Sequence, residues 1–249
     1  MFPGVRDYRI AWVLPSSDQQ AVARDYFDHD IVSCYSSTCR VTYTFGRVEQ
    51  HKVVMASPAS NAENQSTDYI IEDLLRHVPS IRAGFLVSSD AVAPRAGIAR
   101  VGDVVVGGTS PNMERGVIYL DAEKAGKEKR IRIIGASQTL PATVVKAVRE
   151  AMNPEGRKDW EKRLGQDRFT LVMRSVVSSN NGFQPDFVKH LRQALIGVIA
   201  SSKQGIEDTT LLENIVAERD IICFETQAAT MCSYPFLVVT GISKYCDNV

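Results

Sequence analysis

Eight polar residues that could take part in catalysis or binding follow segments with the composition of β-strands. They are Ser17, Asp18, Ser88, Ser89, Asp90, Thr226, Gln227 and Lys244. We expect the apolar strand 236–242 to deliver Lys244 to the open end of a sheet, where α/β proteins bind ligands. Carboxylates and a cation placed in one site would provide acid–base chemistry.

Three of these residues have alternative interpretations. Lys244 either faces a ligand, as a binding cation, a general acid or a Schiff-base nucleophile, or it extends into water or pairs with Asp247. Asp90 either caps a turn or lines a pocket. Asp18 is either a catalytic base or a carboxylate that the dipole of a helix N-terminus stabilises.

Composition limits the class of protein. The 249 residues include 29 basic and 29 acidic side chains, so the formal net charge is zero, and 44% of the residues are hydrophobic. This composition excludes a disordered or collagen-like chain and gives no indication of nucleic-acid or membrane binding. No apolar run reaches the roughly 18–20 residues that span a bilayer. The start lacks the pattern of a signal peptide, so we expect a cytoplasmic protein with one domain over residues 1–249.

Metal and cofactor sites are not expected. The five cysteines form an odd set, and the two closest, Cys34 and Cys39, have no histidine at ligand spacing. The four histidines are scattered singly along the chain. Both features favour reduced thiols over a zinc site or a disulfide framework.

Hydrophobic periodicity predicts strands that alternate with helices. Strands are predicted at 9–14, 41–45, 52–56, 81–87, 101–106, 116–120, 131–134, 221–224 and 236–242. Helices are predicted at 16–27, 67–77, 141–152, 187–198 and 227–232. Turns are expected at Gly46 and at 88–93, a solvated loop at 123–130 and a surface insertion at 153–167. Short connections between strand, helix and strand indicate a sheet that is at least partly parallel.

Four segments carry a resemblance to a known family. They are IAWVLP at 10–15; VPSIRAGFLV at 78–87 with RVGDVVV at 100–106; GVIYLD at 116–121; and FETQAA at 224–229 with FLVVTGIS at 236–243. These segments resemble nucleoside phosphorylases and methylthioadenosine and adenosylhomocysteine nucleosidases, particularly the fungal branch. The resemblance covers most of the chain apart from about 153–215. It implies an α/β fold in which a mixed, twisted sheet has flanking helices.

The resemblance also implies a reaction. Cleavage of a purine N-glycosidic bond makes the ribose cationic, so the family uses an acid for the base and carboxylates near the sugar. The family's acidic residue after the first strand falls at Ser17, its ribose-binding glutamate at Gln227 and its purine-protonating aspartate at Lys244. All three carboxylates are therefore replaced. The family's glycine-rich turn is replaced by SSDAVA at 88–93, which lacks the backbone freedom that an anion site needs.

These departures lead to three hypotheses about function. We favour a repurposed enzyme that uses the former nucleoside pocket for acid–base or cyclisation chemistry on another small molecule, in fungal specialised metabolism. The alternatives are a nucleoside-binding pseudoenzyme, and a residual nucleosidase that uses Asp18 or Asp90 as its carboxylate. The predicted catalytic residues are Lys244, Asp90 and Asp18. The predicted binding residues are Gln227, Ser17, Ser88, Ser89 and Thr226.

The resemblance implies two further features. Family members continue past the last strand into another helix, whereas this sequence stops at Val249, so we expect that helix to be absent. Many relatives complete their sites across a subunit interface, so we expect a homo-oligomer. The expected partner is a nucleoside-like ligand or another metabolite.

Overall fold

A mixed sheet of eleven strands dominates the protein. The computed structural model describes residues 4–28, 31–36, 40–60, 62, 65–94, 98–108, 116–125, 128–153, 155–156, 193–203, 215–216, 219–231 and 233–246. The strands are β1 (Ile10–Val13), β2 (Val32–Ser36), β3 (Val41–Val48), β4 (His51–Pro58), β5 (Ala83–Ala93), β6 (Val104–Gly107), β7 (Val117–Ala125), β8 (Glu128–Ala136), β9 (Ala194–Ser202), β10 (Ile221–Glu225) and β11 (Leu237–Tyr245). The helices are α1 (Ser17–Arg24), α2 (Thr67–His77) and α3 (Ala142–Met152), with 3-10 turns η1 (Val5–Asp7) and η3 (Gln227–Thr230).

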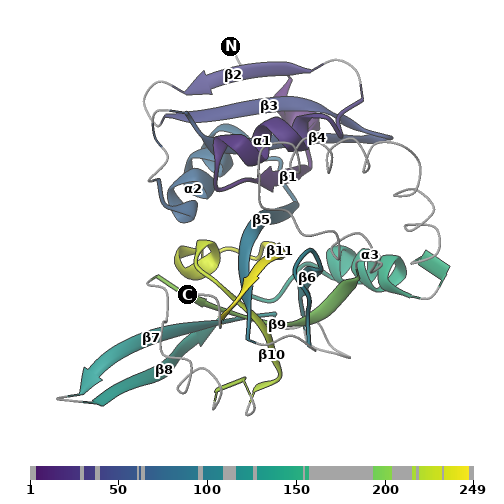
Figure 1. The fold of residues 1–249 in the computed structure, drawn as a ribbon. Coiled ribbons are helices and arrows are strands. Elements are labelled where there is room, and N and C mark those ends of the chain that lie inside the picture. The colour runs from purple at the N-terminus through teal and green to yellow at the C-terminus, as the bar shows by residue number, and fades with distance from the viewer. Residues whose placement is uncertain are drawn as a thin grey trace, which may run out of the picture.

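The strand pairings close part of the sheet into a ring. The order is β2-β3-β4-β1-β5-β11-β6-β9-β7-β8, and β10 pairs with both β5 and β9. Strands β5, β11, β6, β9 and β10 therefore form a small closed barrel, while β1 pairs in parallel with β4 and β5 in the open part. Strand β5 belongs to both parts. Figure 1 shows α1 and α2 beside β1–β4, and the β7–β8 hairpin extending from the other end of the molecule.

Helices cover both faces of the open part. Ala11 and Val13 of β1 belong to the buried cluster that contains Ile70 of α2. Leu14 and the half-buried Trp12 belong to a different cluster, with residues of α1 and the segment after it. Because successive side chains of a strand point to opposite faces, α1 and α2 lie on opposite sides of the sheet. Trp12 is paired with Phe85, which packs against the cluster of α3, so α3 shares the face of α1.

Local sequence explains α2 well. Ile70, Ile71 and Leu74 are fully buried, at the spacing that places side chains on one face of a helix. Each such side chain stabilises the fold by about 1.5–3 kcal/mol when it leaves water. The helix ends at His77, two residues before Pro79, as predicted. None of the helices in the described residues is long and apolar enough to cross a membrane.

The predicted turn at Gly46 is wrong. Gly46 lies inside β3, and the hairpin turns at residues 49–50, where Glu49 adopts a positive φ of 52°. A Cβ atom at Gly46 would lie 2.2 Å from the ring of Phe27. The glycine is therefore present because an aromatic ring packs against the strand, which the sequence pattern did not distinguish from a turn.

Three other predicted elements need correction. The loop 123–130 is wrong, because β7 and β8 extend through it to a hairpin, with residues 126–127 outside the described part. The helix 187–198 is wrong over its described end, where Leu195 and Val198 lie in β9. This apolar run pairs with β6, β7 and β10. Hydrogen bonds to these neighbouring strands therefore decide its structure, although the spacing of its apolar residues also fits a helix. The predicted helix 227–232 is only the short turn η3. Strand β2 was not predicted. The predicted insertion 153–167 falls almost entirely outside the described residues.

Candidate functional site

The residues predicted to form a turn at 88–93 lie in β5. Thr240 of β11 is paired with Ser88, and Ile242 is paired with Ala91. Between these two pairs β5 advances by three residues and β11 by two, so β5 contains one extra residue. This extra residue is a β-bulge at Ser89 and Asp90, and it leaves both of these side chains exposed in succession. The predicted turn at 88–93 is therefore wrong. The segment is a strand, and its bulge changes the direction of the Ser89 and Asp90 side chains so that both are exposed.

Helix α1 contributes a residue that the sequence analysis missed. Ser16 caps the helix by accepting a hydrogen bond from the backbone N–H of Gln19 at 3.2 Å. The Gln19 side chain then donates from Nε2 to Oγ of Ser89 at 3.0 Å, which joins α1 to the bulge of β5. Ser17 is half-buried and Asp18 is exposed. Side chains of a helix tilt toward its N-terminus. Gln19 is the third residue of α1, so its side chain points toward the start of the helix, and this was the signal in the sequence that could have identified it.

A buried carboxylate organises the end of β10. Glu225 is only 5% exposed, and its Oε2 accepts hydrogen bonds from the backbone N–H groups of Gln227 at 2.7 Å and Ala228 at 3.1 Å. It thereby caps η3, the turn that carries Gln227. Glu225 also faces Ser201 in the register between β9 and β10. The carboxylate fixes the backbone at Gln227, whereas Thr226 lies exposed beside it.

Electrostatics connect Glu225 with the bulge. Burial raises the pKa of the Glu225 carboxyl, and the negative charge of Asp90 raises it further. The hydrogen bonds that the carboxylate accepts from the backbone N–H groups of Gln227 and Ala228 act in the opposite direction. Burial also raises the pKa of the Cys223 thiol far above its ordinary range, so this cysteine is not a nucleophile.

Lys244 lies exposed near the end of β11. It is paired with Val92 of β5, and Phe224 of β10 is paired with Val92 from the other side. Paired residues point to the same face of a sheet, so Lys244 shares the face of Phe224 and points away from the face of Glu225. Its alternative partner, Asp247, lies outside the described residues.

The structure therefore brings the predicted residues together only in part. Ser89 and Asp90 lie side by side, with Oγ of Ser89 3.4 Å from Oδ1 of Asp90. Lys244 is paired with Val92, which follows Asp90 by two residues in β5. Ser88 is buried and donates to the Thr240 hydroxyl at 2.7 Å, inside the sheet. Asp18 makes no hydrogen bond or ion pair with the part of the chain that the structure describes. In the same residues, no three His, Cys, Asp or Glu side chains gather as metal ligands would.

Comparisons with known proteins show the fold. No protein-family model matches the chain. No curated protein matches it either. Among solved structures, it is similar to futalosine hydrolase of Helicobacter pylori, with a TM-score of 0.57 and 12% identity over 95% of this chain and 88% of that chain.

Two nucleosidase structures are similar to the same extent. The methylthioadenosine/adenosylhomocysteine nucleosidase of Streptococcus pneumoniae gives a TM-score of 0.57 and 16% identity over 96% of this chain and 87% of that chain. The corresponding enzyme of Neisseria meningitidis gives 0.59 and 11% over 95% and 85%. The predicted α/β fold, a mixed sheet with flanking helices, is thus confirmed as nucleosidase-like. At such identities the similarity establishes the fold and leaves the fungal branch and the replaced carboxylates as predictions.

Proposed function

We propose that the chain binds a nucleoside-like small molecule at the bulge of β5, beyond the end of β1 and beside α1, and acts on it by acid–base chemistry, without releasing a purine. The observation that carries the proposal is the bulge of β5. It exposes Asp90 beside Ser89, in a strand whose residue Val92 is paired with Lys244. The two side chains lie two register positions apart, and no ion pair joins them among the described residues. A ligand that reaches both could exchange a proton with the Asp90 carboxylate and the Lys244 ammonium group.

The backbone of this region supports a ligand other than phosphate. An anion-binding nest needs successive residues that alternate between right-handed and left-handed conformations. Among the described residues, positive φ angles occur at Arg40, Glu49, Gly102 and Asp220, and none occurs between residues 88 and 93. Asp90 adds a negative charge that repels phosphate. We therefore propose that phosphorolysis is not the reaction.

The residue types also support a reaction other than nucleoside hydrolysis. A ribose that becomes cationic is stabilised by carboxylates, and the matching positions hold Ser17, Gln227 and Lys244. A lysine there opposes the charge that develops on the sugar. Gln227 can still bind a hydroxyl group through its amide.

A ligand screen tests the proposal. Thermal melting of the purified chain with nucleosides, free bases and other metabolites should show stabilisation by nucleoside-like compounds, because a ligand that binds only the folded state raises the melting temperature. A compound that stabilises the chain is then incubated with it and examined for conversion by mass spectrometry. Conversion that Asp90→Asn and Lys244→Met both abolish supports the enzyme. Binding without any conversion would favour the pseudoenzyme.

Two assays define what the proposal excludes. Adenine release from 5′-methylthioadenosine should stay far below the enzyme median of about 10 per second. Phosphate should neither accelerate release nor raise the melting temperature relative to chloride at equal ionic strength. Release near that median rate, or a saturable phosphate stabilisation, would contradict the proposal.

A further inference from the structure

Two neighbouring glutamines of α1 differ in how their side-chain amides are satisfied. Gln20 uses both ends of its amide: Nε2 donates to Oγ1 of Thr44 at 3.1 Å, and Oε1 accepts from Oγ of Ser57 at 2.8 Å. These bonds tie α1 to β3 and β4. The contacts of Gln20 therefore belong to the packing of the helix on the sheet.

Gln19 is satisfied at one end only. Its Nε2 donates to Ser89, while Oε1 is buried and accepts no hydrogen bond from any of the described residues. A buried acceptor without a donor destabilises a folded protein, because it has lost its hydrogen bonds to water. The unsatisfied atom lies next to the bulge that exposes Ser89 and Asp90.

We propose that Gln19, whose side chain is half-buried, is a ligand-binding residue whose free amide end turns out of its buried position to hydrogen-bond a hydroxyl group of the ligand. This inference rests on the proposed function and names the chemical group that the site recognises. The Ser89 hydroxyl can accept or donate, so the Gln19 amide can point either end at it. In both orientations the remaining end is unpaired. A hydroxyl group is the ligand group that satisfies either end, since it is both donor and acceptor.

The position of Gln19 supports a sugar hydroxyl as the partner. Through Ser89 it is connected to Asp90, the exposed carboxylate of the bulge. A carboxylate accepts hydrogen bonds from hydroxyl groups, and an amide both donates and accepts them, so the two groups together can bind adjacent hydroxyls of a sugar. The site should therefore distinguish a nucleoside from its free base.

Calorimetric titration with adenosine and adenine tests this inference on three chains. The unaltered chain should bind adenosine. Gln19→Met keeps the length of the side chain and removes the amide, so it should weaken adenosine binding roughly 3- to 10-fold, the value of one hydrogen bond. It should leave adenine binding unchanged. Its melting temperature without ligand should stay within roughly 2 °C of that of the unaltered chain, because loss of the hydrogen bond to Ser89 and removal of an unsatisfied acceptor act in opposite directions.

Gln20→Met is the matched control. It removes the three hydrogen bonds of the Gln20 amide, of which the third runs from Nε2 to the backbone oxygen of Thr42 at 3.5 Å, so the melting temperature should fall by roughly 2–6 °C while adenosine affinity is retained. Gln19→Ala, which truncates the side chain, should lose adenosine affinity as Gln19→Met does.

The outcomes separate the two proposals. Adenosine binding that both Gln19 variants leave intact overturns the role of Gln19 and leaves the proposed function standing. Equal losses of affinity in Gln19→Met and Gln20→Met also overturn it, since the effect would then come from displacement of α1. If the unaltered chain binds neither adenosine nor adenine, the role of Gln19 is overturned. The proposed function is overturned as well when no nucleoside-like compound in the melting screen stabilises the chain.

Discussion

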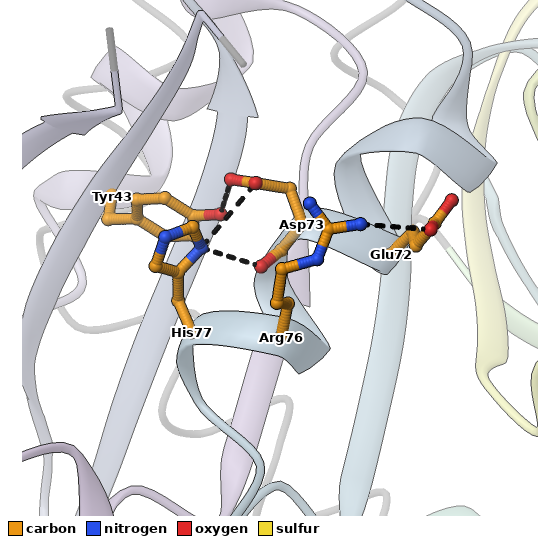
Figure 2. Close-up of polar contacts among 5 residues, drawn as sticks. All are labelled: Tyr43, Glu72, Asp73, Arg76 and His77. Atoms are coloured by element: carbon orange, nitrogen blue, oxygen red, sulfur yellow. Dashed lines mark hydrogen bonds and ion pairs between the residues drawn. The ribbon is translucent and has the colours of Figure 1, made fainter. Parts of the chain in front are cut away.

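Two buried carboxylates, Asp73 and Glu225, have different partners. Asp73 lies in α2, is 2% exposed and accepts a hydrogen bond from the phenol of Tyr43 in β3. Figure 2 shows its other side facing His77, whose Nδ1 lies 3.4 Å from Oδ1 and 2.9 Å from the backbone oxygen of Asp73. Glu225 receives its hydrogen bonds largely from the backbone of η3.

The difference shows that burial of a charged group does not by itself identify a site. The partners of Asp73 hold α2 against β3, which lies three strands away from β5 in the order of the sheet. The nearby ion pair between Glu72 and Arg76 is exposed at both side chains and contributes little. The partners of Glu225 orient the turn that carries Gln227. What a buried carboxylate positions decides its importance for function.

The largest expected effect is on the Asp73 cluster. Tyr43→Phe removes the donor of a buried carboxylate and should lower the free energy of unfolding by about 2–3 kcal/mol in urea denaturation. Tyr35→Phe is the control, because Tyr35 is 52% exposed and should change stability by less than about 0.5 kcal/mol. Stabilisation of the chain by a bound nucleoside should survive in Tyr43→Phe. Loss of the ligand response there would show that the two regions are coupled.

The second effect concerns pH. The pKa of Glu225 is raised in the folded state, chiefly by burial, so folding favours its protonated form. Its contribution to stability is complete below the unfolded pKa of about 4.5 and decreases as pH rises through the folded pKa. Glu225→Gln is neutral at every pH. The free energy of unfolding of the unaltered chain, relative to this variant, should therefore fall as pH rises above about 4.5.

Chemical denaturation of both chains across this range measures that difference. Subtracting one chain from the other removes the titration of all other groups. A difference that is constant with pH, or that increases with pH, would contradict a proton held by Glu225.

The smallest effect on stability is expected at Lys244. Its side chain is exposed, so Lys244→Met should change the free energy of unfolding by less than about 0.5 kcal/mol. Conversion of the ligand should nevertheless be lost, because the variant lacks the ammonium group. A variant that converts the ligand at the rate of the unaltered chain would show that Lys244 is only a surface residue.

The sequence predicted correctly those elements whose structure is determined by residues close together in the chain. Helix α2 was predicted with both ends correct because its apolar spacing and Pro79 are visible in the sequence. Strand β9 was missed because Leu195 and Val198 also fit helical spacing, and only the neighbouring strands decide between the two.

The candidate site was less predictable for the same reason. The segment at Ser89 and Asp90 was identified, but its bulge depends on a register shift against β11 that no local pattern encodes. Gln19 was missed because its importance depends on a contact with a residue 70 positions away. Lys244 was identified, whereas its face of the sheet became known only from the pairing with Val92.

A crystal structure of the chain with adenosine would test the central claim most directly. The account predicts ligand density between Gln19 of α1, the bulge at Ser89 and Asp90, and Gln227 of η3, with a ribose hydroxyl within hydrogen-bonding distance of the Gln19 amide. Adenosine bound at another surface, with these side chains arranged as they are without ligand, would contradict it.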